Sequence, residues 1–140
     1  MAEHTILLVD PDLDYLEWAT KHLSAEGIKI LRCDVADKAL QVIEKTPIDL
    51  VIADLKLEPF TGFELLGQIK VTSPSSIVIL TAGFPSTTQI IESTQRGAHD
   101  VLRKESLSFE LRHVVESALQ TIDQRRDAGN NGDNTPRLEG

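Results

Sequence analysis

The sequence predicts an α/β fold in which five parallel strands form a doubly wound sheet with helices on both faces. Short apolar runs of strand length alternate with segments of helical periodicity along the chain. The third and fourth runs are apolar throughout, which is typical of strands covered on both faces. At 140 residues the chain has room for one domain with a sizeable core. The strand–helix units therefore belong to a single sheet, because each parallel crossover needs its own connection.

The first two strand–helix units are expected within residues 5–46. The strands are "TILLV" at 5–9 and "IKILRC" at 28–33, both of strand length and rich in β-branched residues. The first helix is marked at helical spacing by Leu16, Ala19, Thr20 and Leu23, and Gly27 stops it. The second helix is marked by Ala36, Ala39, Leu40 and Ile43, and it ends before the Thr46–Pro47 pair.

The remaining three units follow the same alternation. The expected strands are "DLVIAD" at 49–54, "SIVIL" at 76–80 and a short "DVL" at 100–102. Helices are expected over 62–70 and 86–96, the second closed by Gly97. The last helix has the clearest apolar face, formed by Leu107, Leu111, Val114, Val115, Ala118, Leu119 and Ile122.

The pattern ends after Ile122. The segment "DQRRDAGNNGDNTPRLEG" is polar and rich in Gly and Asn, a composition that cannot bury an apolar face. We therefore expect one domain over residues 1–124, followed over 125–140 by a flexible polar tail or a truncated linker.

Charge and composition exclude several classes of function. A formal net charge of −8 argues against direct nucleic acid binding, because phosphate backbones attract clustered Lys and Arg. No apolar run approaches the ~20 residues that span a bilayer, and "MAEHTILLVD" lacks the basic start of a signal peptide. The single cysteine, Cys33, allows no internal disulfide. We expect a cytoplasmic protein without a membrane partner.

Polar residues gather where the predicted strands end. Asp10 and Asp12 follow the first strand, Asp54 ends the third, Thr81 follows the fourth, and Lys104 follows the fifth. In open parallel sheets, ligands bind beyond these carboxyl ends. Clustered carboxylates favour a hard divalent cation, and Mg²⁺ takes oxygen ligands while keeping positions open for water and phosphate. A hydroxyl and an ammonium could then hold the oxygens of a phosphoryl group placed on one of the acids.

From about residue 5 to residue 120 the chain resembles the receiver domains of bacterial two-component response regulators. Four motifs carry the resemblance in the right order: "ILLVDPD", "DLVIADLKLEPFTGFELL", "IVILTAG" and "GAHDVLRK". The resemblance implies a flavodoxin-like sheet of order 2-1-3-4-5. It also implies that Asp54 is the phosphoacceptor, and Gly62 falls where the loop glycine of the family falls.

The same resemblance implies a ligand set and partners. Mg²⁺ would be held by Asp54, the acids Asp10 and Asp12 and the backbone carbonyl of Lys56, while Thr81 and Lys104 would contact the phosphate. A histidine kinase or phosphotransfer protein would donate the phosphoryl group. A downstream output protein or a fused output domain would receive the signal.

The chain departs from the family pattern at four positions. Pro11 replaces the second of two adjacent acids after the first strand, and Val101 replaces the aromatic residue three positions before the family lysine. Glu105 stands where a proline usually follows that lysine, and Pro59 lies one place later than the family's loop proline. These differences bear on metal binding and on switching.

Each site residue also has a purely structural interpretation. Asp10, Asp12 or Asp14 could cap the first helix, with Pro11 in its first turn. Asp54 could be a turn residue, Thr81 a strand-end hydroxyl and Lys104 a solvated surface lysine. The spacing alone leaves these alternatives open.

Two classes of function therefore follow from the sequence. In the first, phosphorylation of Asp54 shifts a two-state equilibrium that a partner detects. In the second, the chain is an atypical receiver that binds a partner without phosphoryl chemistry. An enzyme that acts on a diffusible metabolite is not expected, because neither a catalytic histidine nor a glycine-rich nucleotide loop is placed at the strand ends.

Overall fold

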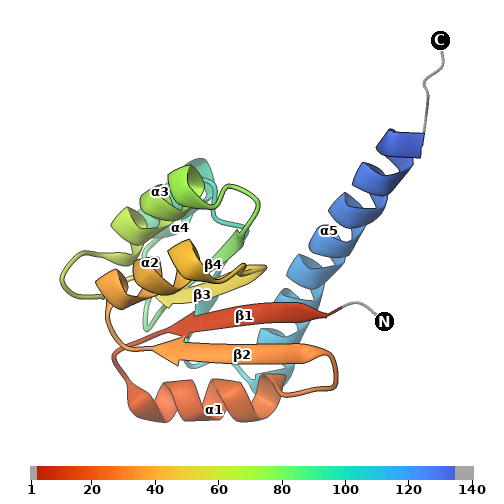
Figure 1. The fold of residues 1–140 in the computed structure, drawn as a ribbon. Coiled ribbons are helices and arrows are strands. Elements are labelled where there is room, and N and C mark those ends of the chain that lie inside the picture. Colours follow the sequence, from red (N-terminus) through yellow and green to blue (C-terminus); the bar gives the residue numbers. More distant parts are fainter. Residues whose placement is uncertain (1–2, 135–140) are drawn as a thin grey trace.

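The computed structural model describes residues 3–134 and forms a five-stranded parallel sheet flanked by five helices (Figure 1). The strands are β1 (His4–Val9), β2 (Ile28–Cys33), β3 (Leu50–Asp54), β4 (Ile77–Ala82) and β5 (Asp100–Arg103). The helices are α1 (Leu13–Leu23), α2 (Ala36–Lys45), α3 (Gly62–Thr72), α4 (Thr87–Gln95) and α5 (Ser108–Asn134). All strand pairs are parallel, and the sheet order β2-β1-β3-β4-β5 confirms the predicted fold class.

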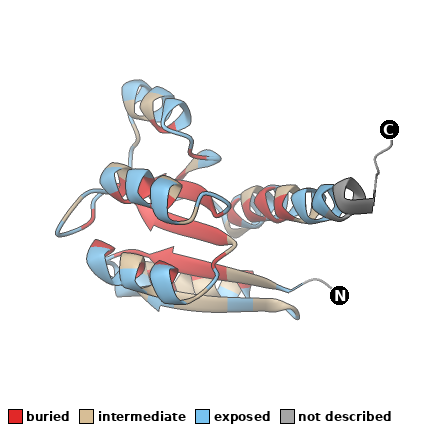
Figure 2. Ribbon diagram, turned by 45° about the horizontal axis from the view of Figure 1, so that its top comes forward, coloured by how far each residue is buried: buried red, intermediate tan, exposed pale blue. Residues whose placement is uncertain are grey.

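Two apolar cores lie on opposite faces of the sheet, because side chains alternate between faces along each strand. Helices α1 and α5 cover one face with residues such as Leu16, Ala19, Leu111 and Val115. Helices α2 and α3 cover the other with residues such as Ala39, Ile43, Leu65 and Ile69. Strands β3 and β4 are buried along their whole length (Figure 2), as their unbroken apolar sequences predict. Helix α4 buries only Ser93 and is the least covered helix.

Helix α5 is longer than the sequence predicts. The sequence predicts a flexible polar tail or a truncated linker from residue 125, whereas the structure continues the helix over 125–134, as far as Asn134. The rest of the predicted tail, 135–140, lies outside the described residues. No helix in the part of the chain that the structure describes is long and apolar enough to cross a membrane.

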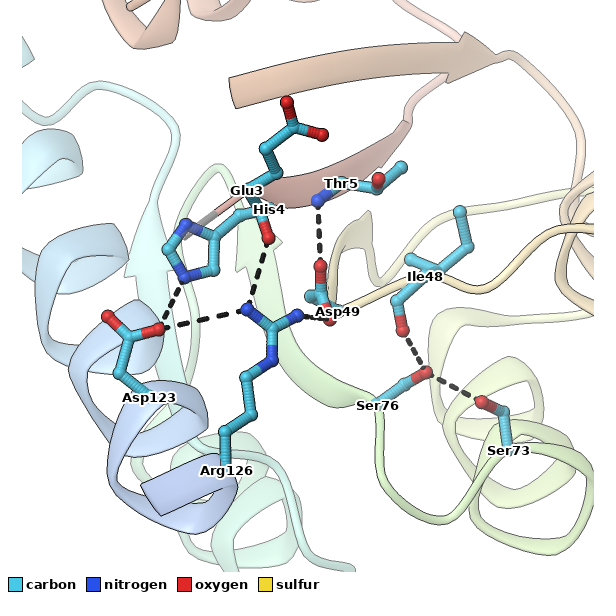
Figure 3. Close-up of polar contacts among 9 residues, drawn as sticks. All are labelled: Glu3, His4, Thr5, Ile48, Asp49, Ser73, Ser76, Asp123 and Arg126. Carbon is cyan, nitrogen blue, oxygen red and sulfur yellow. Dashed lines mark hydrogen bonds and ion pairs between the residues drawn. The ribbon is translucent and has the colours of Figure 1, made fainter. Parts of the chain in front are cut away.

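Polar contacts hold the part of α5 that directly follows its apolar face (Figure 3). The guanidinium of Arg126 donates to the Asp49 carboxylate at 2.8 Å and to the Glu3 carbonyl at 3.1 Å. One turn earlier, Asp123 contacts the His4 ring nitrogen Nε2 at 2.8 Å. Asp49 also accepts a hydrogen bond from the backbone N–H of Thr5. This part of α5 is therefore held to the starts of β1 and β3 by polar and charged groups instead of apolar ones.

Candidate functional site

Four predicted site residues continue the same face of the sheet, the one that packs under α1 and α5. On β1, β3, β4 and β5, every second side chain faces the core under α1 and α5. Continuing that alternation past the apolar residues leads to the polar residues at the carboxyl ends of the strands. The four series are Ile6, Leu8, Asp10; Leu50, Ile52, Asp54; Ile77, Ile79, Thr81; and Leu102, Lys104. The sheet thus gathers one polar group from each of four strands at one edge.

Lys104 joins the two acids of this edge. Its ammonium Nζ lies 2.8 Å from Asp10 Oδ2 and 3.3 Å from Asp54 Oδ2. Asp10 is 2% exposed and Asp54 is 6% exposed, so both carboxylates have lost most of their contact with water. The two acids come from adjacent strands, and a third element supplies the cation between them. The structure therefore excludes the interpretation of Lys104 as a solvated surface lysine.

Burial and neighbouring charges push the pKa values of Asp10 and Lys104 in opposite directions. Burial raises the pKa of the Asp10 carboxyl above its ordinary value of 3.8, although hydrogen bonding to Lys104 opposes the shift. Burial alone would lower the pKa of the Lys104 ammonium, but its contacts with Asp10 and Asp54 outweigh burial and the pKa is raised. Lys104 therefore stays protonated at neutral pH, as a group that binds phosphate oxygens must.

Asp12 caps the start of α1, as the structural interpretation of the sequence proposes. Its Oδ1 accepts hydrogen bonds from the backbone N–H groups of Asp14 and Tyr15 at 3.0 and 3.3 Å, and its backbone is extended as an N-cap requires. The Asp12 side chain is exposed and forms no ion pair with Lys104, whereas its backbone N–H donates to Asp10 Oδ1 at 2.8 Å. Both capping bonds use Oδ1, so capping and a ligand role through Oδ2 are compatible, and that role stays a prediction.

Lys56 and Thr81 lie on either side of Asp54. The backbone N–H of Lys56 donates to Asp54 Oδ1 at 3.2 Å, while the Lys56 side chain is exposed. Thr81 is the register partner of Asp54 on the neighbouring strand. Its hydroxyl is buried and has no hydrogen-bond partner among the described residues. An unsatisfied buried hydroxyl costs about 1–3 kcal/mol, which a ligand oxygen at this position would offset.

Gly62 allows α3 to begin directly against the Asp54 backbone. A Cβ atom at position 62 would lie 2.4 Å from the Asp54 carbonyl oxygen and 2.8 Å from Leu55 Cα. The Gly62 N–H donates to the Leu55 carbonyl at 2.9 Å, and Thr61 and Glu64 form a capping box at the same turn. A close backbone approach, which only glycine permits here, therefore fixes the loop that follows Asp54.

An open cleft of about 590 Å³ lies beside Asp54. Its walls come from the loops after β3, β4 and β5, and they include Lys56, Phe84, Gln89, Lys104 and Glu105. The cleft combines a buried carboxylate with cationic and amide groups from its rim. A group the size of phosphate can therefore reach Asp54 from solvent.

Comparison with known proteins settles the family. Residues 6–116 match the family model described as the response regulator receiver domain. This chain belongs to the response regulator receiver domain family. The match includes β2 to β5, most of β1, and each residue of the Asp10, Asp54, Thr81 and Lys104 cluster.

Relatives of this receiver domain include much longer proteins. The transcriptional regulatory protein GlrR of Escherichia coli is 28% identical over 82% of this chain, and the nitrogen assimilation regulatory protein NtrX of Azorhizobium caulinodans is 30% identical over 89%. The chain spans 26% and 28% of these two proteins, or about a quarter of their length. Among solved structures, the receiver domain of an HD domain-containing protein from Pseudomonas fluorescens superposes with a TM-score of 0.83 at 28% identity, covering 91% of this chain and 94% of that one.

The receiver residues fit a magnesium ion through a small ligand set. In the described part of the chain, no group of three or more His, Cys, Asp and Glu side chains is placed to hold a metal. Mg²⁺, however, is commonly bound by only one or two carboxylates together with waters and phosphate oxygens. The Asp10 and Asp54 carboxylates lie close enough to share one ammonium, which shows that a single cation can contact both.

One residue of the site escaped sequence reasoning. The Tyr15 ring on α1 lies with its centroid 4.9 Å from Lys104 Nζ. The available signal was an aromatic residue in the first turn of the helix that follows Asp10 and Asp12. That signal is weak, because helical periodicity does not state which residue of another element a ring will contact.

Proposed function

We propose that this receiver domain accepts a phosphoryl group on Asp54 from a phosphohistidine of a histidine kinase or a phosphotransfer protein. One observation carries the proposal: Asp54 opens onto a cleft while Lys104 bridges it to Asp10. A structural turn residue would need neither a buried ammonium nor an open cleft. The buried Thr81 hydroxyl without a partner supports the same assignment.

The chemistry assigned to these residues is a displacement at phosphorus. A carboxylate oxygen of Asp54 forms a bond to phosphorus as the bond from phosphorus to the donor imidazole nitrogen breaks, and the electron pair leaves with that nitrogen. Lys104 and Thr81 donate hydrogen bonds to the phosphoryl oxygens. The Lys104 ammonium stabilises the negative charge on these oxygens. The product is an acyl phosphate on Asp54.

Magnesium is the proposed cofactor. Asp10, Asp54 and the backbone carbonyl of Lys56 would hold it, with Asp12 as a further candidate ligand, and it would neutralise phosphoryl charge when bound. Within the chain itself, Lys104 already offsets part of the negative charge of the two acids, so the site is not purely anionic before a metal arrives.

We further propose how the phosphorylation state reaches a partner. Val101 lies in β5 where the family usually carries an aromatic residue, so no ring is available at that position. The β4–α4 segment instead exposes Phe84, Ile90 and Ile91, next to the cleft and beyond it. A downstream output protein or a fused output domain would respond to movement of this segment. The relatives named as transcriptional regulators make an output in gene regulation the first possibility to test.

Phosphodonor labelling tests the proposal directly. The chain is incubated with acetyl phosphate and Mg²⁺, and intact mass is measured with time. We expect the addition of one phosphoryl group, lost on treatment with hydroxylamine, in the parent and in Asp37→Asn, which changes an exposed acid on α2. Asp54→Asn should not be labelled. Equal labelling of Asp54→Asn and the parent would refute the assignment, and no labelling of either would favour a phosphorylation-independent interaction module.

A further inference from the structure

Tyr15 contacts the Lys104 ammonium from α1, an element that carries neither of its carboxylate partners. The ammonium lies over the Tyr15 ring at 4.9 Å from the centroid, within the ~6 Å range of a cation–π contact. The Lys104 side chain is 18% exposed, so this contact forms mostly out of water, where it is stronger. Lys104 therefore has three partners: Asp10, Asp54 and an aromatic face.

The ring of Tyr15 is held in place by its own helix. The indole of Trp18 packs against it with centroids 5.6 Å apart, and His22 packs against Trp18 at 5.0 Å. The three residues lie at i, i+3 and i+7 on one side of α1, where successive turns bring side chains together. The aromatic face beneath Lys104 is therefore part of a stack and not a freely rotating ring.

The hydroxyl of Tyr15 is buried, and no described residue forms a hydrogen bond with it. The contact of Tyr15 with Lys104 is made by the ring.

We infer that Tyr15 is a positioning residue for Lys104, whose ring holds the ammonium in place while Asp10 and Asp54 change partners during phosphorylation. The inference rests on the proposed function of Asp54. A lysine side chain is long and flexible, and it holds a fixed position only when its contacts constrain it. Asp10 and Asp54 are also the residues proposed to bind metal and phosphoryl group, so their contacts with Lys104 are the ones exposed to competition. The contact with Tyr15 is not.

Two variants distinguish the effect of the aromatic face of Tyr15 from the effects of its apolar bulk and its hydroxyl. Tyr15→Phe keeps the ring and removes only the unpaired hydroxyl, whereas Tyr15→Leu keeps an apolar side chain and removes the aromatic face. We expect the initial rate of Asp54 labelling by acetyl phosphate to fall about fivefold in Tyr15→Leu, which corresponds to about 1 kcal/mol for a cation–π contact. The labelling rate of Tyr15→Phe should stay within about twofold of the parent, because the phenylalanine ring can still form a cation–π contact with Lys104.

A second background tests whether Tyr15 acts through Lys104. In Lys104→Gln, the change Tyr15→Leu should have no further effect on the labelling rate, because the cation that the ring holds is absent. An equal fall in both backgrounds would show a general structural role and overturn the inference. So would a fall in Tyr15→Phe as large as that in Tyr15→Leu, or a parent-like rate in Tyr15→Leu.

A spectroscopic readout keeps this test independent of phosphorylation. The Lys104 Cε protons should resonate upfield in the parent and in Tyr15→Phe because of the ring current, and the shift should vanish in Tyr15→Leu. If Asp54→Asn is labelled like the parent, the proposed function fails, and the ring-current shift still decides whether the ring holds Lys104. Unshifted Cε protons in the parent would overturn the inference whatever the labelling shows.

Discussion

The ammonium of Lys104 lies 2.8 Å from the carboxylate of Asp10, and this ion pair is shorter than the 3.3 Å pair between Lys104 and Asp54. Asp10 is also the more deeply buried of the two acids. Lys104, which lines the cleft, is therefore held mainly by Asp10. This arrangement leaves Asp54 with the longer contact, which suits the role of phosphoacceptor proposed for it.

Removing the charge of Asp10 is expected to change how the stability of the fold depends on pH. Burial raises the pKa of Asp10 in the folded state, so ionised Asp10 costs stability. That stability is fully present below the unfolded-state value near 3.8 and is lost as pH rises through the raised folded-state pKa. Asp10→Asn should therefore gain on the parent as pH rises toward 7, measured by urea unfolding across that range. A constant difference from acid to neutral pH would contradict a raised folded-state pKa for Asp10.

Removing Lys104 is expected to lower the stability of the fold at neutral pH. Lys104→Gln leaves two buried carboxylates without their cation, and breaking a fully buried pair in this way typically costs about 3–5 kcal/mol. Because the Lys104 side chain is 18% exposed, we expect a smaller loss, about 1–3 kcal/mol in the free energy of unfolding at pH 7. The loss should shrink as pH falls through the raised pKa of the Asp10 carboxyl. Arg103→Gln, at an exposed neighbouring position, is the matched control and should change stability little.

Two glycines on α3 give a matched pair for the loop after Asp54. A Cβ at Gly62 would collide with backbone atoms of Asp54 and Leu55, whereas a Cβ at Gly67 would meet nothing within 4 Å. We expect Gly62→Ala to lower the free energy of unfolding by about 1–3 kcal/mol, the usual cost of an overpacked site. Gly67→Ala should be stabilising by about 0.5–1 kcal/mol, because alanine replaces glycine inside a helix. Thermal or urea unfolding of both variants measures the contrast, and equal effects would show that the close approach at Gly62 is absent.

The fold was predictable because strand alternation and helical spacing are local signals. Asp10, Asp54, Thr81 and Lys104 could be placed together because parallel strands end at one edge of the sheet. The partners of individual side chains were not predictable in this way. The contact between Tyr15 and Lys104, like that between Arg126 and Asp49, joins residues far apart in sequence, and no periodicity encodes it. The length of α5 was missed for a different reason: its last turns carry no apolar residues at helical spacing that would mark them as helix.

The contact between Arg126 and the body of the domain predicts the stability of the end of α5. Arg126→Ala removes the bonds to Asp49 and to the Glu3 carbonyl (Figure 3). We expect backbone amides after Ile122 to exchange with solvent several times faster, with little change in the core strands, because local opening draws on local contacts. Hydrogen exchange measured by mass spectrometry resolves the two regions. Arg125→Ala is the control at an adjacent exposed position, and an equal effect there would mean that helix propensity, not the contact, holds this end of α5.

The acids after β1 predict how tightly this receiver binds Mg²⁺. Pro11 stands where a second adjacent acid is usual, and it cannot ligate through its side chain, while Asp12 uses one oxygen to cap α1. We expect weak binding, because losing or displacing one oxygen ligand can cost about 10- to 100-fold in affinity, by analogy with losses in the outer shell of metal sites. Pro11→Asp should therefore bind Mg²⁺ about tenfold more tightly or better, by the same analogy. The emission of Trp18, the only tryptophan, follows a Mg²⁺ titration because its ring packs on Tyr15 beside Lys104.

Substitutions at Asp12 separate its capping role from a ligand role. Asparagine caps helices about as well as aspartate, whereas alanine costs about 1 kcal/mol at an N-cap. Asp12→Asn should therefore leave the free energy of unfolding unchanged and weaken Mg²⁺ binding, since an amide is a poorer ligand than a carboxylate for this hard cation. Asp12→Ala should lose both. If Asp12→Asn binds Mg²⁺ like the parent and Pro11→Asp binds no tighter, the acids after Asp10 serve only the helix, and the metal depends on Asp10 and Asp54 alone.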